Sequence, residues 1–162
     1  MEHAPRADRT VLVVDDDNFI VAALAEILEE DGFDVHTASN GFSAQRQAAE
    51  LRPAVGLLDL ALPERSGGDL LHDFRSDAAT HDMAIVVVTG HADELSESQL
   101  AEADDVITKP FDESDLLLRV HRAVQRAASR HAEVAPIAAI AHPKVAARPR
   151  RAANPRRSRG RR

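Results

Sequence analysis

The chain has 162 residues, a length typical of one domain, and folding at this size buries roughly two thirds of the surface of the unfolded chain. It contains no cysteine, which excludes disulfides, thiolate metal sites and thiol nucleophiles. No segment approaches the roughly 18 apolar residues that a membrane-spanning helix requires, and no apolar stretch precedes the first predicted strand. We therefore expect a soluble cytoplasmic protein that does not bind membranes.

The formal net charge of −7 is unevenly distributed along the chain. Residues 1–125 contain 26 acidic and 9 basic side chains, a net charge of −17. Residues 126–162 contain 1 acidic and 11 basic side chains, a net charge of +10. This asymmetry predicts that the two parts of the chain have different roles.

The first predicted strand is the β-branched run at residues 10–14, which ends at three consecutive carboxylates, residues 15–17. The next segment has its apolar side chains on one helical face, and either Asp17 or Asn18 can cap the start of that helix. Residues 33–37 then alternate apolar and polar side chains, which predicts a second strand.

A second helix over about residues 42–51 leads to the centre of the chain. Residues 55–58 form a short apolar run between two prolines, which predicts a buried strand. This strand delivers the carboxylate of Asp59 to a loop, and a third helix follows after Gly67 and Gly68.

The last two strands also end at polar residues. Residues 85–88 predict a buried strand that ends at Thr89, and residues 106–108 predict a short strand that ends at Lys109. Residues 93–103 between them predict a weak, polar helix, and a strongly periodic helix follows the last strand.

Five strands that alternate with five helices predict a doubly wound α/β fold, with one parallel sheet covered on both faces. Ligands of open sheets bind beyond the carboxyl ends of the strands, where the strand order reverses. If the first and third strands are neighbours at that point, Asp15, Asp16 and Asp59 share one pocket. The polar strand ends are therefore the predicted site.

The C-terminal part changes in composition to alanine, proline and arginine, with few large apolar side chains. Such a segment cannot bury enough surface to offset its ordering entropy. We therefore expect an N-terminal extension at residues 1–9, a folded domain at residues 10–128 and a disordered basic tail at residues 129–162.

Three roles stay open for this tail: a solvated extension, a contact with the acidic domain, or binding of nucleic-acid phosphates. The tail has no aromatic residue on which bases could stack, so binding of DNA or RNA would be salt-sensitive and unselective.

The predicted pocket combines negative and positive groups. Several carboxylates in one place repel each other and need a counter-charge, and a site with oxygen ligands alone suits a hard cation such as Mg²⁺. Lys109 brings a second positive charge, and Thr89 brings a hydroxyl that can bond a phosphoryl oxygen. These groups together predict a site that tolerates further negative charge on Asp59, as a phosphoryl group would bring.

Over roughly residues 10–126 the sequence resembles the response-regulator receiver family. The matching motifs follow one another in order at strand ends, which makes the signal specific. They are Val14-Asp15-Asp16, Asp59 with Pro63 and Gly67 after it, Thr89-Gly90, and Lys109-Pro110-Phe111. The resemblance implies a flavodoxin-like (βα)5 receiver with the strand order 2-1-3-4-5.

The resemblance implies that Asp59 accepts a phosphoryl group from a histidine kinase or a phosphotransfer protein in a two-component phosphorelay. Lys109 and Thr89 would bind the phosphoryl oxygens in an in-line transfer, in which the protein mainly positions groups and neutralises charge. Such a protein is a phospho-acceptor and not a conventional enzyme. It would signal by phosphorylation-dependent contact with a downstream protein or act as a phosphate sink.

The resemblance also implies Mg²⁺ as the cofactor. Asp16 would bind the ion directly and Asp15 through water, and Asp59 and the backbone carbonyl of Ala61 would complete the site. The Lys109–Pro110 peptide bond would be cis, which proline permits at modest cost.

Three positions depart from the family's pattern. Val106 lies where most receivers have Tyr or Phe, whose ring moves inward together with the threonine, and this chain has no Tyr. This departure concerns how the phosphoryl group is read out and not how it is accepted. Arg65, where Met is common, and Glu102, where Gly is frequent, are lesser departures.

Two other classes fit the sequence less well. Enzymes of the haloacid-dehalogenase kind form an aspartyl phosphate on a similar sheet, but they need a second Asp where this chain has Ala61. A dinucleotide-binding domain would need Gly-x-Gly-x-x-Gly after the first strand, and this motif is missing there. The remaining alternative is a regulator that binds DNA or RNA through the basic tail.

Overall fold

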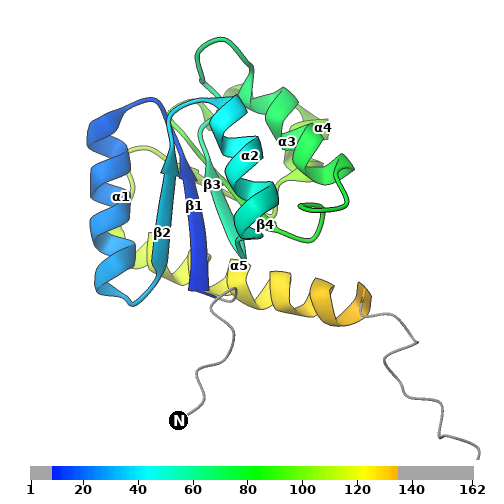
Figure 1. The fold of residues 1–162 in the computed structure, drawn as a ribbon. Helices are drawn as coiled ribbons and strands as arrows, with labels where there is room; N and C mark the ends of the chain where they lie inside the picture. The colour runs from blue at the N-terminus through cyan, green and yellow to red at the C-terminus, as the bar shows by residue number, and fades with distance from the viewer. Residues whose placement is uncertain (1–8, 135–162) are drawn as a thin grey trace, which may run out of the picture.

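A five-stranded parallel sheet lies at the centre of the molecule, with the strands in the order β2-β1-β3-β4-β5. The structure is a computed structural model and describes residues 9–134. Figure 1 shows that helices cover both faces of this sheet. The predicted doubly wound fold and strand order are therefore confirmed. The strands are β1 (Thr10–Val14), β2 (Asp34–Ala38), β3 (Val55–Leu58), β4 (Ala84–Thr89) and β5 (Asp105–Thr108).

Side-chain oxygens cap the starts of several helices, as the sequence pattern favours. Asp17 is the N-cap of α1, since its carboxylate accepts a hydrogen bond from the Phe19 amide. The helices are α1 (Asn18–Glu30), α2 (Gly41–Leu51), α3 (Gly67–Ser76), the short 3-10 helix η2 (Ala92–Glu94), α4 (Glu97–Glu102) and α5 (Glu113–Val134).

The fourth helix is shorter than the sequence pattern predicts. Residues 93–103 are divided between η2 and α4, because Leu95 is extended and a new helix begins after Ser96. Ser96 and Gln99 form a capping box, in which each side chain accepts a hydrogen bond from the other residue's backbone amide. This local pairing determines where α4 begins.

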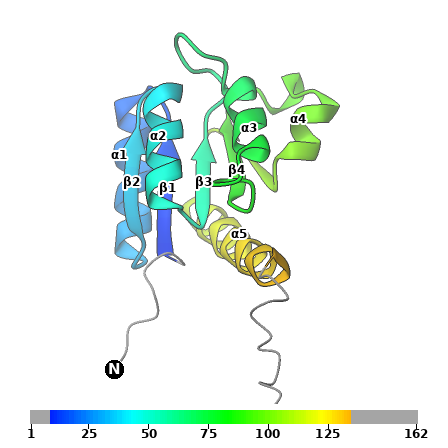
Figure 2. The ribbon, with the colours of Figure 1, turned by 45° about the vertical axis from the view of Figure 1, so that its right-hand side comes forward.

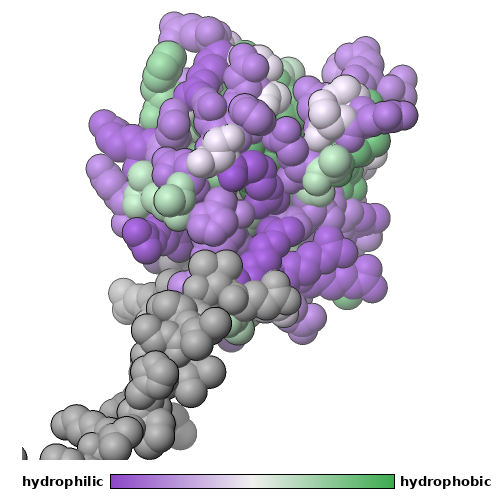
Figure 3. Space-filling view, turned by 90° about the vertical axis from the view of Figure 1, so that its right-hand side faces the viewer, coloured by the Kyte–Doolittle hydropathy of each residue, from purple (hydrophilic) through white to green (hydrophobic). Residues whose placement is uncertain are grey.

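The apolar side chains form two layers, one on each face of the sheet. Helices α1 and α5 pack on one face, and α2 and α3 pack on the other. Figure 2 shows these two groups of helices on opposite sides of the strands. Hydrophilic side chains dominate the surface seen in Figure 3. Both faces of the central strands are thus buried, which explains why these strands are continuous apolar runs.

Helix α5 continues to Val134, beyond residue 129, where the disordered tail was expected to begin. Its last turns are attached to the sheet through Arg130, which forms an ion pair with Asp104, just before β5. The side chain of Asp104 is only 5% exposed and also accepts hydrogen bonds from Arg75 and from the Ile85 amide, each at 2.8 Å. These partners stabilise a helical end that the composition does not reveal.

Residues 1–8 and 135–162 lie outside the described residues, so the expected extension and most of the expected tail lie there. Within residues 9–134, no helix combines the length and apolar character needed to cross a membrane.

Candidate functional site

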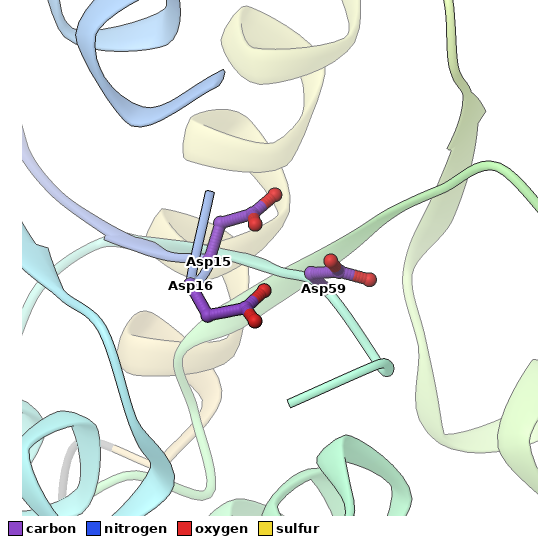
Figure 4. A group of neighbouring side chains, drawn as sticks. All are labelled: Asp15, Asp16 and Asp59. Atoms are coloured by element: carbon purple, nitrogen blue, oxygen red, sulfur yellow. The ribbon is translucent and has the colours of Figure 1, made fainter. Parts of the chain in front are cut away.

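Three carboxylates meet at the carboxyl edge of the sheet. Asp15 and Asp16 follow β1 and Asp59 follows β3, and these strands pair directly, with Val14 opposite Leu58. One carboxylate oxygen from each of the three residues lies within 4.8 Å of the other two. Figure 4 shows the three side chains extending from the two strand ends toward the same region. The pocket expected from the strand pattern is therefore present.

The three carboxylates differ in burial. Asp15 and Asp59 are 2% and 6% exposed, whereas Asp16 lies at the surface. One oxygen of each buried carboxylate accepts a hydrogen bond from the backbone amide two residues later: Asp17 donates to Asp15 at 2.9 Å and Ala61 donates to Asp59 at 3.1 Å. This leaves the other oxygen of each buried carboxylate available for a cation.

Lys109, which follows the edge strand β5, supplies a cation to the pocket. Its backbone amide donates to the Thr89 carbonyl at 2.8 Å, which holds the end of β5 beside β4. Its Nζ lies 2.7 Å from Asp15 Oδ2 and 3.3 Å from Asp59 Oδ2. Burial lowers the pKa of Lys109, but the hydrogen bond with Asp15 and the charge of Asp59 outweigh it, so that this pKa lies above its usual value. Lys109 is therefore charged at neutral pH.

Thr89 lies at the end of β4 and is 5% exposed. Its hydroxyl oxygen accepts a hydrogen bond from the His91 amide at 3.0 Å. Among residues 9–134, no hydrogen bond joins this hydroxyl to the three carboxylates or to the Lys109 ammonium. The side chain is thus at the expected edge of the sheet but bonded within its own turn. Val106 is partly buried on the neighbouring strand β5.

The loop between β3 and α3 is closed close to Asp59. The Gly67 amide donates to the Leu60 carbonyl at 3.1 Å. A Cβ atom on Gly67 would lie 2.4 Å from Leu60 Cα and 2.6 Å from the Asp59 carbonyl oxygen, so only glycine fits there. The Lys109–Pro110 bond on the other side of the pocket is cis, as the resemblance implied.

The contacts of Arg65, a residue near the site, could not be predicted from its position in the sequence. Arg65, noted above only as a departure from the family's pattern, contacts side chains of both α2 and α3. The arginine and its partners are 20 and 8 residues apart in the chain, in different helices, so no local spacing rule relates them.

The pocket offers donors that suit a hydrated magnesium ion. All three side chains are carboxylates, and hard cations prefer oxygen ligands. The exposed position of Asp16 leaves one side of the cluster open to the water molecules that Mg²⁺ usually retains. The residues present therefore fit this ion.

The model of the response regulator receiver domain matches residues 11–121. The chain is 33% identical over 131 residues to the "DNA-binding dual master transcriptional regulator RpaA" of Synechocystis. This alignment covers 76% of this chain and 54% of that protein. It is 41% identical over 118 residues to the transcriptional regulatory protein KdpE of Mycobacterium tuberculosis, in an alignment that covers 72% of this chain and 51% of that protein. The chain thus spans about half the length of these curated relatives.

Solved structures show the same fold. A CheY-like receiver domain protein from Methanospirillum hungatei superposes with a TM-score of 0.66 at 25% identity, covering 75% of this chain and 97% of that one. The receiver domain of NtrX from Brucella abortus gives a TM-score of 0.66 at 30% identity, covering 71% and 98%.

Asp15, Asp16 and Asp59 form an acidic pocket typical of phospho-accepting response regulators, and such a cluster is typical of the receiver Mg²⁺ site. A receiver is a phospho-acceptor signalling domain and not a conventional enzyme, and it implies a cognate histidine kinase. By its matched sequence, its strand order and this pocket, the chain belongs to the response regulator receiver family of two-component signalling.

Proposed function

We propose that Asp59 accepts a phosphoryl group from a histidine kinase or a histidine phosphotransfer protein. The observation that supports this most directly is the environment of its carboxylate. Oδ1 is held by the Ala61 amide, and Oδ2 lies 3.3 Å from the Lys109 ammonium beside two further carboxylates. One carboxylate oxygen is thus oriented, and positive charge stands beside the other.

In the proposed transfer, an Asp59 oxygen forms a bond to phosphorus while the bond from phosphorus to the donor's histidine nitrogen breaks. Lys109 would remain protonated and bind a phosphoryl oxygen, since its pKa is raised. Thr89, whose hydroxyl oxygen accepts a hydrogen bond from the His91 amide, would donate its hydroxyl proton to another phosphoryl oxygen. The protein's contribution is positioning and charge neutralisation, as phosphoryl transfer requires.

The residues that would hold Mg²⁺ are Asp16 directly, Asp15 through water, Asp59 and the backbone carbonyl of Ala61. When bound, the ion neutralises the charge that develops on the transferred group. The repulsion between the closely spaced carboxylates supports this assignment, because a single lysine offsets only part of their charge.

We propose that the receiver extends from residue 10 to the end of α5 at Val134, flanked by an extension at residues 1–9 and a basic tail. We also propose that the protein is cytoplasmic, as response regulators typically are. It would act through phosphorylation-dependent contact with a downstream protein or as a phosphate sink.

Phosphorylation can be tested directly on the full chain. Incubation with Mg²⁺ and acetyl phosphate, followed by intact-mass measurement, should show addition of one phosphoryl group to the wild type. Asp59→Asn should remove the label, because an amide is a poor nucleophile. Asp17→Asn is the matched control, since Asp17 caps α1. Full labelling of Asp59→Asn would exclude Asp59 as the acceptor.

A second candidate function rests on charge. Residues 126–162 carry a net charge of +10, which favours non-specific contact with DNA or RNA phosphates. The relative RpaA is described as DNA-binding, although this chain covers only 54% of it. In mobility-shift assays, full-chain binding should weaken strongly with salt. It should be lost when the eight arginines of residues 148–162 become glutamine. Equal binding by that variant would exclude the idea.

A further inference from the structure

Arg65, in the loop between β3 and α3, is surrounded by side chains of two helices. Its Nη1 donates a hydrogen bond to Gln45 Oε1 of α2 at 2.6 Å, and its Nη2 forms an ion pair with Asp73 of α3. Its Cζ lies 5.7 Å from the centre of the Phe42 ring, within the range of a cation–π contact. The Arg65 side chain is only 17% exposed although its neighbours in the loop lie at the surface.

The start of α2 is shaped to admit this arginine. A Cβ atom on Gly41 would lie 3.0 Å from Arg65 Cδ and 3.4 Å from its Cβ, tighter than ordinary contacts. Gly41 is itself buried, and the ring of Phe42, the next residue, contacts the Arg65 guanidinium. The side chain of Arg65 therefore passes across the first turn of α2 and links that turn to the loop.

The same loop carries two of the groups proposed to hold Mg²⁺, the Asp59 carboxylate and the Ala61 carbonyl. Ala61 lies four residues before Arg65, and its amide orients the Asp59 carboxylate. Gly67, two residues after Arg65, closes the loop against Leu60. Leu60 and Leu62 pack on the apolar layer beneath α2 and α3. Arg65 is thus the charged side chain that fastens the outer part of the loop to both flanking helices.

We propose that Arg65 is a positioning residue that sets the affinity of the acidic pocket for Mg²⁺. By tying the loop to Gln45 and Asp73, it holds the Ala61 carbonyl and the Asp59 carboxylate in one arrangement. Without this attachment the loop samples other arrangements, and ordering it is then part of the cost of binding the ion. The proposal rests on the proposed function, because it assumes that Mg²⁺ binds at this pocket.

The charges of Arg65 and Asp73 form an ion pair and largely cancel beyond their contact, so the arginine acts on the pocket through its position and not through its charge. Arg65→Met removes all three contacts while keeping a long side chain. Arg46→Met is the matched control: it removes the same charge from the neighbour of Gln45, at an exposed position without a described contact among residues 9–134.

The affinity can be measured without phosphorylation. Mg²⁺ binding to the full chain can be titrated through the amide NMR signals of residues 59–67. The dissociation constant should be about tenfold higher for Arg65→Met than for the wild type, which is the lower end of the effect expected when a group that orients metal ligands is removed. The Arg46→Met value should match the wild type. The rate of labelling by acetyl phosphate should fall for Arg65→Met at low Mg²⁺ and recover at saturating Mg²⁺.

Asp73→Asn tests the same attachment from α3. It should weaken Mg²⁺ binding in the same direction, and the double variant Arg65→Met/Asp73→Asn should be no weaker than Arg65→Met alone, because both changes remove one ion pair. This variant also decides the question if Arg65→Met fails to fold.

The outcomes separate the two proposals. A wild type that shows no Mg²⁺ binding at residues 59–67 would overturn the proposed function. A wild type that binds, with unchanged affinity in both Arg65→Met and Asp73→Asn, would overturn the positioning role alone. A labelling rate that stays low at saturating Mg²⁺ would also overturn it, since the defect would then not lie in metal affinity.

Discussion

The ammonium of Lys109 lies 2.7 Å from Asp15 Oδ2, although the two residues are 94 positions apart in the chain. Asp15 is 2% exposed, so this contact compensates a charge that is removed from water. The pair joins the ends of β1 and β5, at opposite sides of the central strand β3. It therefore contributes both to stability and to the electrostatics of the pocket.

Lys109→Met should destabilise the metal-free protein by about 1–3 kcal/mol, because it leaves two buried carboxylates without their cation. Urea unfolding followed by far-UV circular dichroism measures this, since the chain has neither Trp nor Tyr. Millimolar Mg²⁺ should restore part of the loss by supplying another cation. An unfolding midpoint equal to that of the wild type without metal would contradict the assignment.

The stabilisation by Lys109 should depend on pH only at alkaline values. Its pKa in the folded protein lies above the usual 10.5, so the folded state holds this proton more tightly. The contribution is fully present below the unfolded pKa and is lost as pH rises through the folded one. The difference in unfolding free energy between wild type and Lys109→Met should be constant from neutral pH to about pH 10. A difference that already declines near neutral pH would contradict the raised pKa.

Asp104 should show the opposite dependence. Burial raises its pKa, but hydrogen bonds from Arg130 and the Ile85 amide and the charge of Arg75 outweigh it, so that this pKa lies below the usual 3.8. Its contribution is present above the unfolded pKa and is lost as pH falls through the folded one. Asp104→Asn should cost about 1–3 kcal/mol at neutral pH.

Urea unfolding at a series of pH values checks this behaviour of Asp104. The deficit of Asp104→Asn should begin to shrink as pH falls below about 3.8, the usual value at which the unfolded chain takes up this proton. It should disappear only below the lowered pKa of the folded state, where the wild type also carries a neutral side chain. Glu50→Gln is the control, since Glu50 is exposed and has no described contact among residues 9–134. A deficit that persists unchanged in acid would indicate a role for Asp104 other than its charge.

Gly67→Ala should destabilise the protein by about 1–3 kcal/mol, because the new methyl group meets the backbone of Leu60 and Asp59 at 2.4 and 2.6 Å. Gly90→Ala, with no atom within 4 Å of the added Cβ, should change stability little. Thermal unfolding of the two variants compares them directly. Equal melting temperatures would show that the loop after Asp59 yields more easily than its packing indicates.

Asp16→Asn should make the metal-free protein at least as stable as the wild type, because it removes one of three clustered negative charges. The same change should reduce the stabilisation that Mg²⁺ provides, since ligands that bind the folded state stabilise it by mass action. Unfolding in EDTA and in millimolar Mg²⁺ measures both effects. A gain from Mg²⁺ equal to that of the wild type would show that Asp16 is not a ligand.

Much of the site could be predicted from residues at strand ends. Asp15, Asp59 and Lys109 each directly follow an apolar or β-branched run, and in a parallel sheet the carboxyl ends of all strands meet at one edge. Local periodicity therefore placed these side chains at one edge of the sheet, whereas the order of the strands along that edge came from the family resemblance. The identity of Asp17 as the cap of α1 was left open with Asn18, because both side chains can cap and only the backbone conformation distinguishes them.

The errors concern the positions at which two helices begin or end. Composition predicted a tail from residue 129, but α5 continues to Val134 because Arg130 meets Asp104, 26 residues earlier. The fourth helix was predicted too long, because the capping box at Ser96 divides it from η2.

The sequence by itself determined the α/β class, the order of the elements and the acidic residues of the pocket, because these follow from periods of a few residues and from the common direction of parallel strands. Only the tertiary structure decided which side chains surround Arg65 and Asp104. Their partners come from separate helices and loops, and their contacts exist only after the sheet and its helices have packed. For the same reason, the charge balance of the pocket became known only when Lys109 was placed beside Asp15.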